Sequence, residues 1–304
     1  MKKLIAIILC AAALFSFAGC GTKTDRDENK LQIVTTIFPF YDFARQVGGD
    51  KVQVTLILPT GAEAHSYEPT PKDVITIKES DLFIAQGGDA DPWTSAVIND
   101  ADSKELNVLY ALESVTLMSE EHEHPSLSSH VHTDPHVWTT PKNAAKISES
   151  ISDRLCAIDS ENSDYYKENL ALYKEKLNSL DEKFITLTKD IDKTIVFADQ
   201  FPLRYFAKEY NLKYLAAFPG CSAESEPTAS AVAQIIDTVK KEKIPVVFYT
   251  ETSNKQLANA VCEETGTEKL LFHSCHSVTD DELKSGVTYL DLMEKNYEAL
   301  KKAI

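Results

Sequence analysis

Three histidines in separate loops are the residues of this chain best suited to carry chemistry. His65 follows an apolar segment that ends at Leu58, His136 lies in the sequence Asp-Pro-His-Val-Trp, and His273 follows an apolar segment that ends at Phe272. Imidazole nitrogens are preferred ligands of transition metals, so histidines that converge from distant loops usually hold such an ion. Because the three lie far apart in the chain, they can meet only in a cleft formed by the fold.

The N-terminus has the pattern of an export signal. A basic start precedes the apolar run Leu4–Ala18, which is shorter than the roughly 20 residues that span a bilayer. The run leads into Phe-Ala-Gly-Cys, which resembles a bacterial lipobox in which Cys20 would be acylated. The alternative is an ordinary signal peptide with an incidental cysteine. We favour lipidation, with residues 1–19 as signal peptide and residues 20–29 as a tether that holds the protein outside the cytoplasm on the cell membrane.

The charge of the chain argues against some partners. The sequence has 31 Lys+Arg and 47 Asp+Glu, a net charge of -16. Loss of two lysines with the signal leaves 29 against 47, or -18. An acidic surface disfavours nucleic acid and electrostatic binding to anionic lipid, and it is compatible with attracting cations.

Strand-like and helix-like segments alternate in both halves of the chain. This order predicts an α/β protein of two lobes, residues 30–162 and 191–304, each with a mainly parallel four-stranded sheet flanked by helices. We expect strands over residues 31–36, 52–58, 81–86, 107–110, 194–198, 213–217, 245–250 and 269–272. We expect helices over residues 41–47, 71–79, 92–100, 202–210, 228–242, 254–265 and 289–302.

One long amphipathic helix is expected between the lobes, over residues 163–190. Apolar residues recur at spacings of four and three from Tyr166 to Ile191, with charged residues between them. Such a stripe fits a coiled-coil dimerisation helix or a rigid spine packed across both lobes. We favour the spine, and a monomer, because only about four heptads are present. The polar segment before it contains clustered His and Glu over residues 120–132, which would bind zinc or nickel weakly.

Several blocks of the sequence resemble the zinc/manganese substrate-binding lipoproteins of bacterial ABC importers, the cluster 9 solute-binding proteins. The resemblance covers essentially the whole mature chain, in order, and implies two α/β lobes joined by one spine helix. It also implies a metal ion held between the lobes and delivered to a membrane permease. The blocks are TTIFPFYDFA (35–44), GGD (48–50), LPTGAEAHSYEPTP (58–71), DLFIAQGG (81–88), DPHVW (134–138), YFAKEYNL (205–212) and TYLDLM (288–293).

The resemblance further implies a ligand set of three histidines and a carboxylate, one from each of four loops. His65 and His136 match the first two loops. The third loop has Gln200 at the histidine position, preceded by Asp199, and the fourth has His273 at the aspartate position. Three imidazoles are kept, a set that favours Zn²⁺ over the harder Mn²⁺.

The fourth place in the coordination stays open. Water, Asp199, Glu251 or His276 could fill it, while Gln200 and Glu251 fit better as residues that orient a ligand. Because imidazoles bind metal only when neutral, affinity should fall as the pH drops through about 6.5.

Two cysteines are expected at the same edge of the second sheet, Cys221 after one strand and Cys275 between two histidines. A Cys₂His₂ zinc site is conceivable there. In an oxidising compartment we favour a Cys221–Cys275 disulfide that braces the loop. Cys156 and Cys262 would then be buried and free.

These features favour a binding component of an ABC-type metal uptake system, with no catalysis. One alternative is a metal-stabilised surface adhesin, which a lipid anchor fits equally well. A secreted metallohydrolase is less favoured, because the sequence has no His-Glu-x-x-His pair and no Gly-x-Ser-x-Gly elbow.

Overall fold

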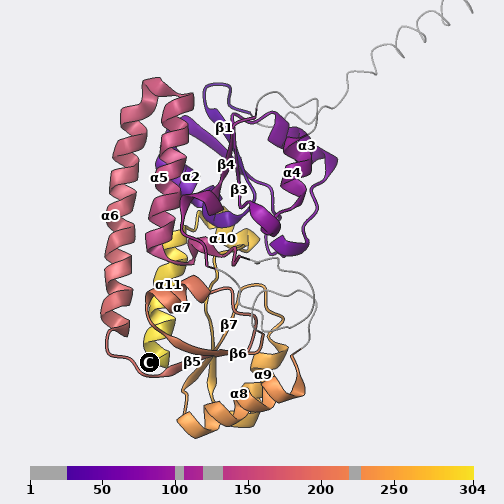
Figure 1. Cartoon of the computed structure of the whole chain (residues 1–304), viewed down its shortest axis with the longest axis vertical. Helices are drawn as coiled ribbons and strands as arrows, with labels where there is room; N and C mark the ends of the chain where they lie inside the picture. The colour runs from indigo at the N-terminus through magenta and orange to yellow at the C-terminus, as the bar shows by residue number, and fades with distance from the viewer. Residues whose placement is uncertain (1–25, 100–105, 119–132, 219–226) are drawn as a thin grey trace, which may run out of the picture.

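Two four-stranded parallel sheets form the framework of the protein (Figure 1). The computed structural model describes residues 26–99, 106–118, 133–218 and 227–304. The first sheet has the order β2-β1-β3-β4 and the second the order β6-β5-β7-β8, so the expected fold class is confirmed. The strands are β1 (Leu31–Thr35), β2 (Val52–Leu56), β3 (Leu82–Ala85), β4 (Val108–Tyr110), β5 (Thr194–Phe197), β6 (Lys213–Ala216), β7 (Val246–Tyr249) and β8 (Glu268–Leu271).

Helices cover both faces of each sheet, and central strands such as β3 and β5 are accordingly apolar on both sides. In the first sheet, Ile33 and Ile84 face one cluster of buried side chains, and the adjacent Val34 and Phe83 face another. The first cluster includes residues of α2 and α5, and the second includes residues of α3 and α4. These helices are α2 (Phe38–Gly48), α3 (Pro71–Lys78), α4 (Trp93–Ile98) and α5 (Pro141–Ile158).

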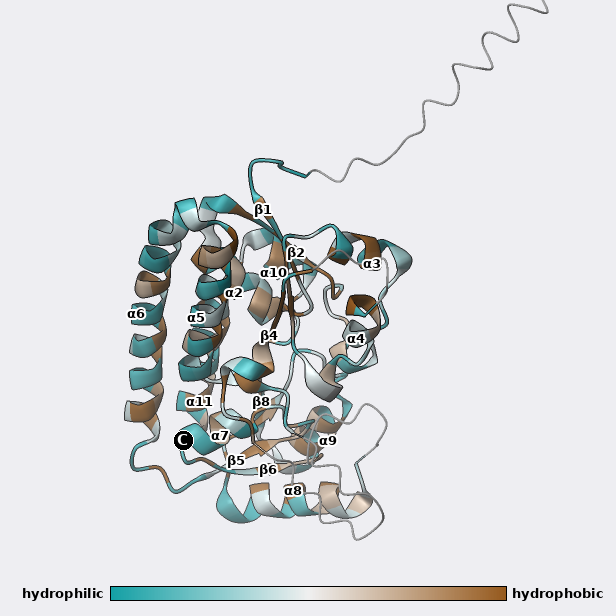
Figure 2. Ribbon diagram, turned by 45° about the horizontal axis from the view of Figure 1, so that its top comes forward, coloured by the Kyte–Doolittle hydropathy of each residue, from teal (hydrophilic) through white to brown (hydrophobic). Residues whose placement is uncertain are grey.

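The second sheet repeats this arrangement. Val196 and Val247 pack on residues of α8 and α9, whereas Phe197 and Phe248 face the opposite side, toward residues of α7 and α11. In Figure 2 hydrophobic residues concentrate on the strands, while helices such as α8 alternate hydrophobic and hydrophilic residues. The helices are α7 (Arg204–Glu209), α8 (Ala229–Glu242), α9 (Gln256–Thr265), α10 (Asp280–Ser285) and α11 (Tyr289–Ala303).

A long helix runs beside both lobes, as the apolar stripe predicted (Figure 1). It is α6 (Ser163–Thr188), 26 residues long, and its buried positions include Tyr166, Tyr173, Leu177 and Leu180. The preceding helix α5 packs along it, although the sequence pattern does not predict a helix there. Cluster residues of α5 and α6 belong to one continuous core that reaches both sheets, so the lobes share their packing.

The segment after β8 returns from the second lobe to the first. The backbone N–H of Gly61 donates to the carbonyl of Val278 at 3.0 Å. At the start of α11, the backbone N–H of Tyr289 donates to the Asp42 carboxylate at 2.9 Å. The loop between β8 and α10 is therefore fixed to elements of the first lobe, although it follows the last strand of the second.

Short 3₁₀ turns connect several of these elements and two of them lie next to the histidines of interest. The 3₁₀ turns are η1 (Gly49–Lys51), η2 (Ala64–Ser66), η3 (Gly88–Ala90), η4 (Ala111–Ser114), η5 (Val137–Thr139) and η6 (Ser160–Asn162).

Among the described residues, no helix is long and apolar enough to cross a membrane.

The fully buried Phe184 tests how much the packing of α6 on the second lobe stabilises the protein. Its ring contacts Phe206 of α7 at 5.0 Å and Tyr297 of α11 at 5.7 Å between centroids. We expect Phe184→Ala to lower the free energy of unfolding by about 3–5 kcal/mol, because a large cavity is left in the core. Leu172 on the same helix is 53% exposed. Leu172→Ala should therefore change the free energy of unfolding by only about 0.5 kcal/mol. Urea denaturation of both variants measures these changes in the free energy of unfolding. Equal losses in the two variants would contradict the structural role of α6.

Candidate metal site

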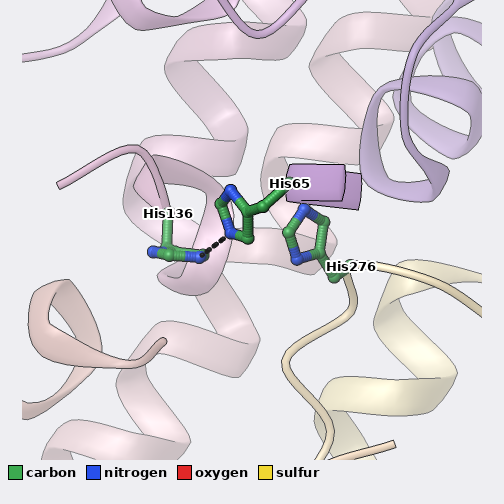
Figure 3. A group of neighbouring side chains, drawn as sticks. All are labelled: His65, His136 and His276. Atoms are coloured by element: carbon green, nitrogen blue, oxygen red, sulfur yellow. Dashed lines mark hydrogen bonds between the residues drawn. The ribbon is translucent and has the colours of Figure 1, made fainter. Parts of the chain in front are cut away.

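Three histidines from three distant segments converge beyond the carboxyl ends of the sheets. They are His65, His136 and His276, and their potential ligand nitrogens all lie within 4.8 Å of one another. The three rings stand together, with His65 between the other two in the view of Figure 3. Their centroids are 5.2 to 5.6 Å apart. Ligand sites at this edge are a general property of open parallel sheets.

His65 is positioned by the loop that follows β2. It lies in the turn η2, and the Glu63 side chain caps this turn by accepting the backbone N–H of His65 at 3.3 Å. The imidazole is half-buried. Its Nε2 lies 3.3 Å from Nε2 of His136, so the two rings face each other through the atoms that could bind a metal.

His136 is oriented by the buried carboxylate of Asp134. One oxygen of Asp134 accepts Nδ1–H of His136 at 2.7 Å and its backbone N–H at 3.0 Å. Because an ionised carboxylate can only accept, Nδ1 carries the proton and the lone pair of the neutral ring is on Nε2, the atom nearest His65. Burial alone raises the pKa of Asp134, but the hydrogen bonds and charge of His136 bring it below its ordinary value.

His276 is held through its peptide rather than through its ring. Its backbone N–H donates to Glu251 at 2.9 Å, and its carbonyl accepts the backbone N–H of Phe38 at 3.4 Å. The side chain is buried, and its Nε2 has no hydrogen-bond partner within the described part of the chain. Trp138 covers the ring at 5.0 Å between centroids, and its indole N–H donates to the carbonyl of Ser274 at 2.9 Å.

The surroundings of His65 and His276 keep their imidazoles neutral near pH 7. Burial and the nearby charge of His136 lower the pKa of His65 to about 4, against an opposing effect of Asp134. Burial and the charges of His136 and His65 lower the pKa of His276 well below its ordinary value. Near neutral pH both side chains therefore offer unprotonated nitrogens.

A divalent cation fits this arrangement. A buried nitrogen without a partner, such as Nε2 of His276, is unfavourable, and Nε2 of His65 and of His136 lie only 3.3 Å apart. One metal ion among the three rings would bond all of these nitrogens at once, as transition metals do with neutral imidazoles. The same ion would fix each ring in its present orientation.

The structure brings together two of the three histidines expected as ligands and adds one that was only an alternative. His273 is not in the group. Its Nδ1 accepts the backbone N–H of Cys275 at 2.9 Å and lies 3.4 Å from Glu251. Its backbone is paired in both directions with the Asn296 side chain, at 2.6 and 2.7 Å. The group instead contains His276, three residues further along the same loop.

The other candidates occupy different places. Asp199 accepts the N–H and the hydroxyl of Thr250 at 2.8 and 2.7 Å, so one of its oxygens is committed to the end of β7. Gln200 is half-buried and is not a member of the histidine group. Cys275 is fully buried and makes no disulfide within the described residues. Cys20, Cys221 and residues 120–132 lie outside the described residues, so lipidation, the disulfide and the His/Glu cluster stay predictions.

A two-lobed parallel α/β fold with converging loop histidines defines a metal-binding protein. Over residues 33–303 the chain matches the family described as zinc-uptake complex component A, periplasmic, and it belongs to that family. The family comprises binding components of transport systems, not enzymes.

Two similar proteins place the chain within the family. It is 33% identical to the zinc-binding lipoprotein AdcA of Streptococcus pneumoniae, over 99% of this chain and 61% of AdcA, so it spans about three fifths of that relative. It is 30% identical to the high-affinity zinc uptake system protein ZnuA of Bacillus subtilis, over 100% of this chain and 98% of ZnuA.

Solved structures agree. The Zn(II)-bound ZnuA-like domain of Streptococcus pneumoniae AdcA is 33% identical, with a TM-score of 0.76 over 90% of this chain and 98% of that domain. The laminin-binding protein Lmb of Streptococcus agalactiae is 27% identical, with a TM-score of 0.77 over 90% and 99%. Lmb is described as a bifunctional protein with adhesin and metal-transporting activity.

The lowered pKa values predict how acid affects the metal-free protein. Unfolded histidines take up a proton near pH 6.5, whereas folded His65 does so only near pH 4 and His276 well below 6.5. Between these values these two side chains bind more protons in the unfolded chain, so their contribution to the free energy of unfolding should decrease as the pH falls from about 6.5 to 4. Asp91, whose pKa burial raises to about 6, acts in the opposite direction in this range. Asp134 and Glu251 have lowered pKa values and lose their contribution only below about 4.5.

Urea denaturation with chelator present, at several pH values, measures this decrease. His276→Gln removes one titrating group and should make the dependence shallower in that range. A variant with the same slope as the parent protein would show that His276 is not a buried neutral imidazole.

Proposed function

We propose that this protein is the extracytoplasmic Zn²⁺-binding component of an ABC-type uptake system. It would capture the ion at His65, His136 and His276 and deliver it to a membrane permease. The convergence of three imidazoles with potential ligand nitrogens within 4.8 Å of one another is the observation that carries this proposal. Membership of the zinc-uptake component A family supports it.

The donor set favours zinc over manganese. The group consists of imidazoles alone, and the nearby carboxylates of Asp134 and Glu251 are engaged with N–H donors of the protein. Mn²⁺ prefers oxygen ligands, whereas Zn²⁺ accepts nitrogen readily. Zinc would be the cargo of this site rather than a resident cofactor.

The lipid anchor at Cys20 would keep the captured ion close to the permease. One relative, AdcA of Streptococcus pneumoniae, is named a lipoprotein. We infer the same location for this chain from Cys20 and the apolar segment before it.

A chelator-competition titration tests the proposal on the full chain, purified in mild detergent and stripped of metal. We expect one tight Zn²⁺ per chain, nanomolar or tighter, with Mn²⁺ at least 100-fold weaker. Chelators of graded strength separate this site from weak binding by the His/Glu cluster of residues 120–132. Absence of a tight site for either metal would refute the transport proposal.

Two alanine variants decide which histidine of the fourth loop binds the ion. We expect His276→Ala to weaken zinc binding at least tenfold, because it removes a nitrogen of the group. His273→Ala should cost less, since its Nδ1 faces the backbone N–H of Cys275. Isothermal titration of both variants measures the difference. The reverse order, with His276→Ala binding like the parent, would restore His273 as the ligand.

Surface adhesion is the second candidate function, and the likeness to Lmb favours it. That protein is named laminin-binding and is described with both activities. Binding of this chain to immobilised laminin, with and without zinc, separates the two functions. Tight zinc binding without laminin binding would leave transport alone.

A further inference from the structure

Glu251 accepts several hydrogen bonds from the loop that carries His276. One oxygen accepts the backbone N–H of Ser274 at 2.8 Å. The other accepts the Ser274 hydroxyl at 2.6 Å and the backbone N–H of His276 at 2.9 Å. The carboxylate follows β7, and its side chain is only 8% exposed. Three good donors, two of them backbone groups of one short loop, fix that loop relative to the second sheet.

The peptide of His276 is held from both lobes at once. Glu251 binds its N–H from the second lobe, and the N–H of Phe38 in the first lobe binds its carbonyl at 3.4 Å. On the first-lobe side, Trp138 also binds the carbonyl of Ser274 at 2.9 Å. The direction in which the His276 ring leaves the backbone is therefore set by contacts from two lobes.

The loop needs this support because its backbone is strained. Cys275, between the two residues that Glu251 binds, has a φ of 63°, in the left-handed region that residues with a side chain rarely adopt. Such a conformation persists only where the surroundings hold it. His276, after this turn, belongs to the group with His65 and His136, whereas His273, before it, does not.

We propose that Glu251 is a positioning residue that orients His276 toward His65 and His136 and so sets the zinc affinity of the site. This inference rests on the proposed zinc-binding function. Glu251 is not a member of the histidine group, and both of its oxygens accept donors of the 274–276 loop, so it acts on the ligand loop rather than as a ligand. Residues that hold metal ligands in place typically change affinity about 10- to 100-fold when they are altered.

Glu251→Gln is the test, since it keeps the size of the side chain and replaces one acceptor oxygen with an NH₂ donor. We expect zinc affinity to fall about 10- to 100-fold. The visible absorption of the Co²⁺-loaded protein should change as well, because it reports the geometry of the ligands. A purely structural role would lower thermal stability and leave this spectrum as in the parent.

Glu282→Gln is the matched control. Glu282 accepts the backbone N–H and the hydroxyl of Thr279 at 3.1 and 3.0 Å, the same pair of donor types that Ser274 gives to Glu251. It caps α10 and makes no hydrogen bond to the 274–276 loop. We expect its zinc affinity to stay within about twofold of the parent and its Co²⁺ spectrum to be unchanged.

Ser274→Ala keeps the inference testable if Glu251→Gln does not fold. It removes the hydroxyl that donates to Glu251 and also lies 3.3 Å from the N–H of His276. A several-fold loss of affinity with a shifted Co²⁺ spectrum would support the inference.

Parent-like affinity and spectrum in folded Glu251→Gln, or in Ser274→Ala where the first variant is lost, would overturn it. Failure of the parent protein itself to bind zinc would instead overturn the proposed function.

Discussion

Three imidazoles held side by side in a buried place are tolerable only while they remain neutral, and the rest of the site follows from this constraint. Protons on two of them would repel each other across a few ångströms of protein rather than water, and a protonated nitrogen cannot bind a metal. Burial meets this constraint for His65 and His276, because it lowers their pKa values, whereas the charges of Asp134 and Glu251 act in the opposite direction. The two carboxylates instead hold the ligand segments in place from their far sides. Asp134 holds the ring of His136, and Glu251 holds the peptide of His276. The negative charges lie behind the ligands, where they favour a cation without occupying its coordination positions.

The arrangement of the fold explains how such distant residues can meet. Parallel sheets bring the loops after their strands to a common edge, and the segment after β8 returns to the first lobe at Gly61 and Asp42. The long helices α5 and α6 and the common core keep the two sheets in a fixed relation. Opening the site by loop movement therefore requires less free energy than separating the lobes, because separation would expose core residues to water.

Alternation and composition predicted the eight strands closely, because fully buried parallel strands are short apolar runs between turns. The helix α5 is not predicted from its pattern, although Thr140 caps it and Pro141 begins it, signals that the sequence displays. The helix has many small and polar residues, so its apolar periodicity is weak in the sequence. The buried residues of its apolar face include Ile147, Ile151 and Leu155.

The two histidines that follow the strand edges of the first lobe could be chosen from their positions in the sequence. The choice between His273 and His276 could not, because it depends on the left-handed turn at Cys275 and on Glu251 from another strand. The periodicity of apolar residues in a sequence does not predict a left-handed conformation at one residue or a hydrogen bond between distant segments. Trp138, which covers His276, belongs to the same short block as His136, yet its partner lies far away in the chain.

The spacing of the ligands along the chain has a consequence for the order of synthesis. Residues 65 and 136 precede the whole second sheet, while residue 276 follows its last strand β8. A nascent chain can thus form much of the first lobe with only two of its imidazoles, and two imidazoles hold a metal weakly. The third arrives together with the returning segment and α11. Binding through all three imidazoles would accordingly require synthesis at least through this segment, and a copy that stops before it would compete poorly for the ion.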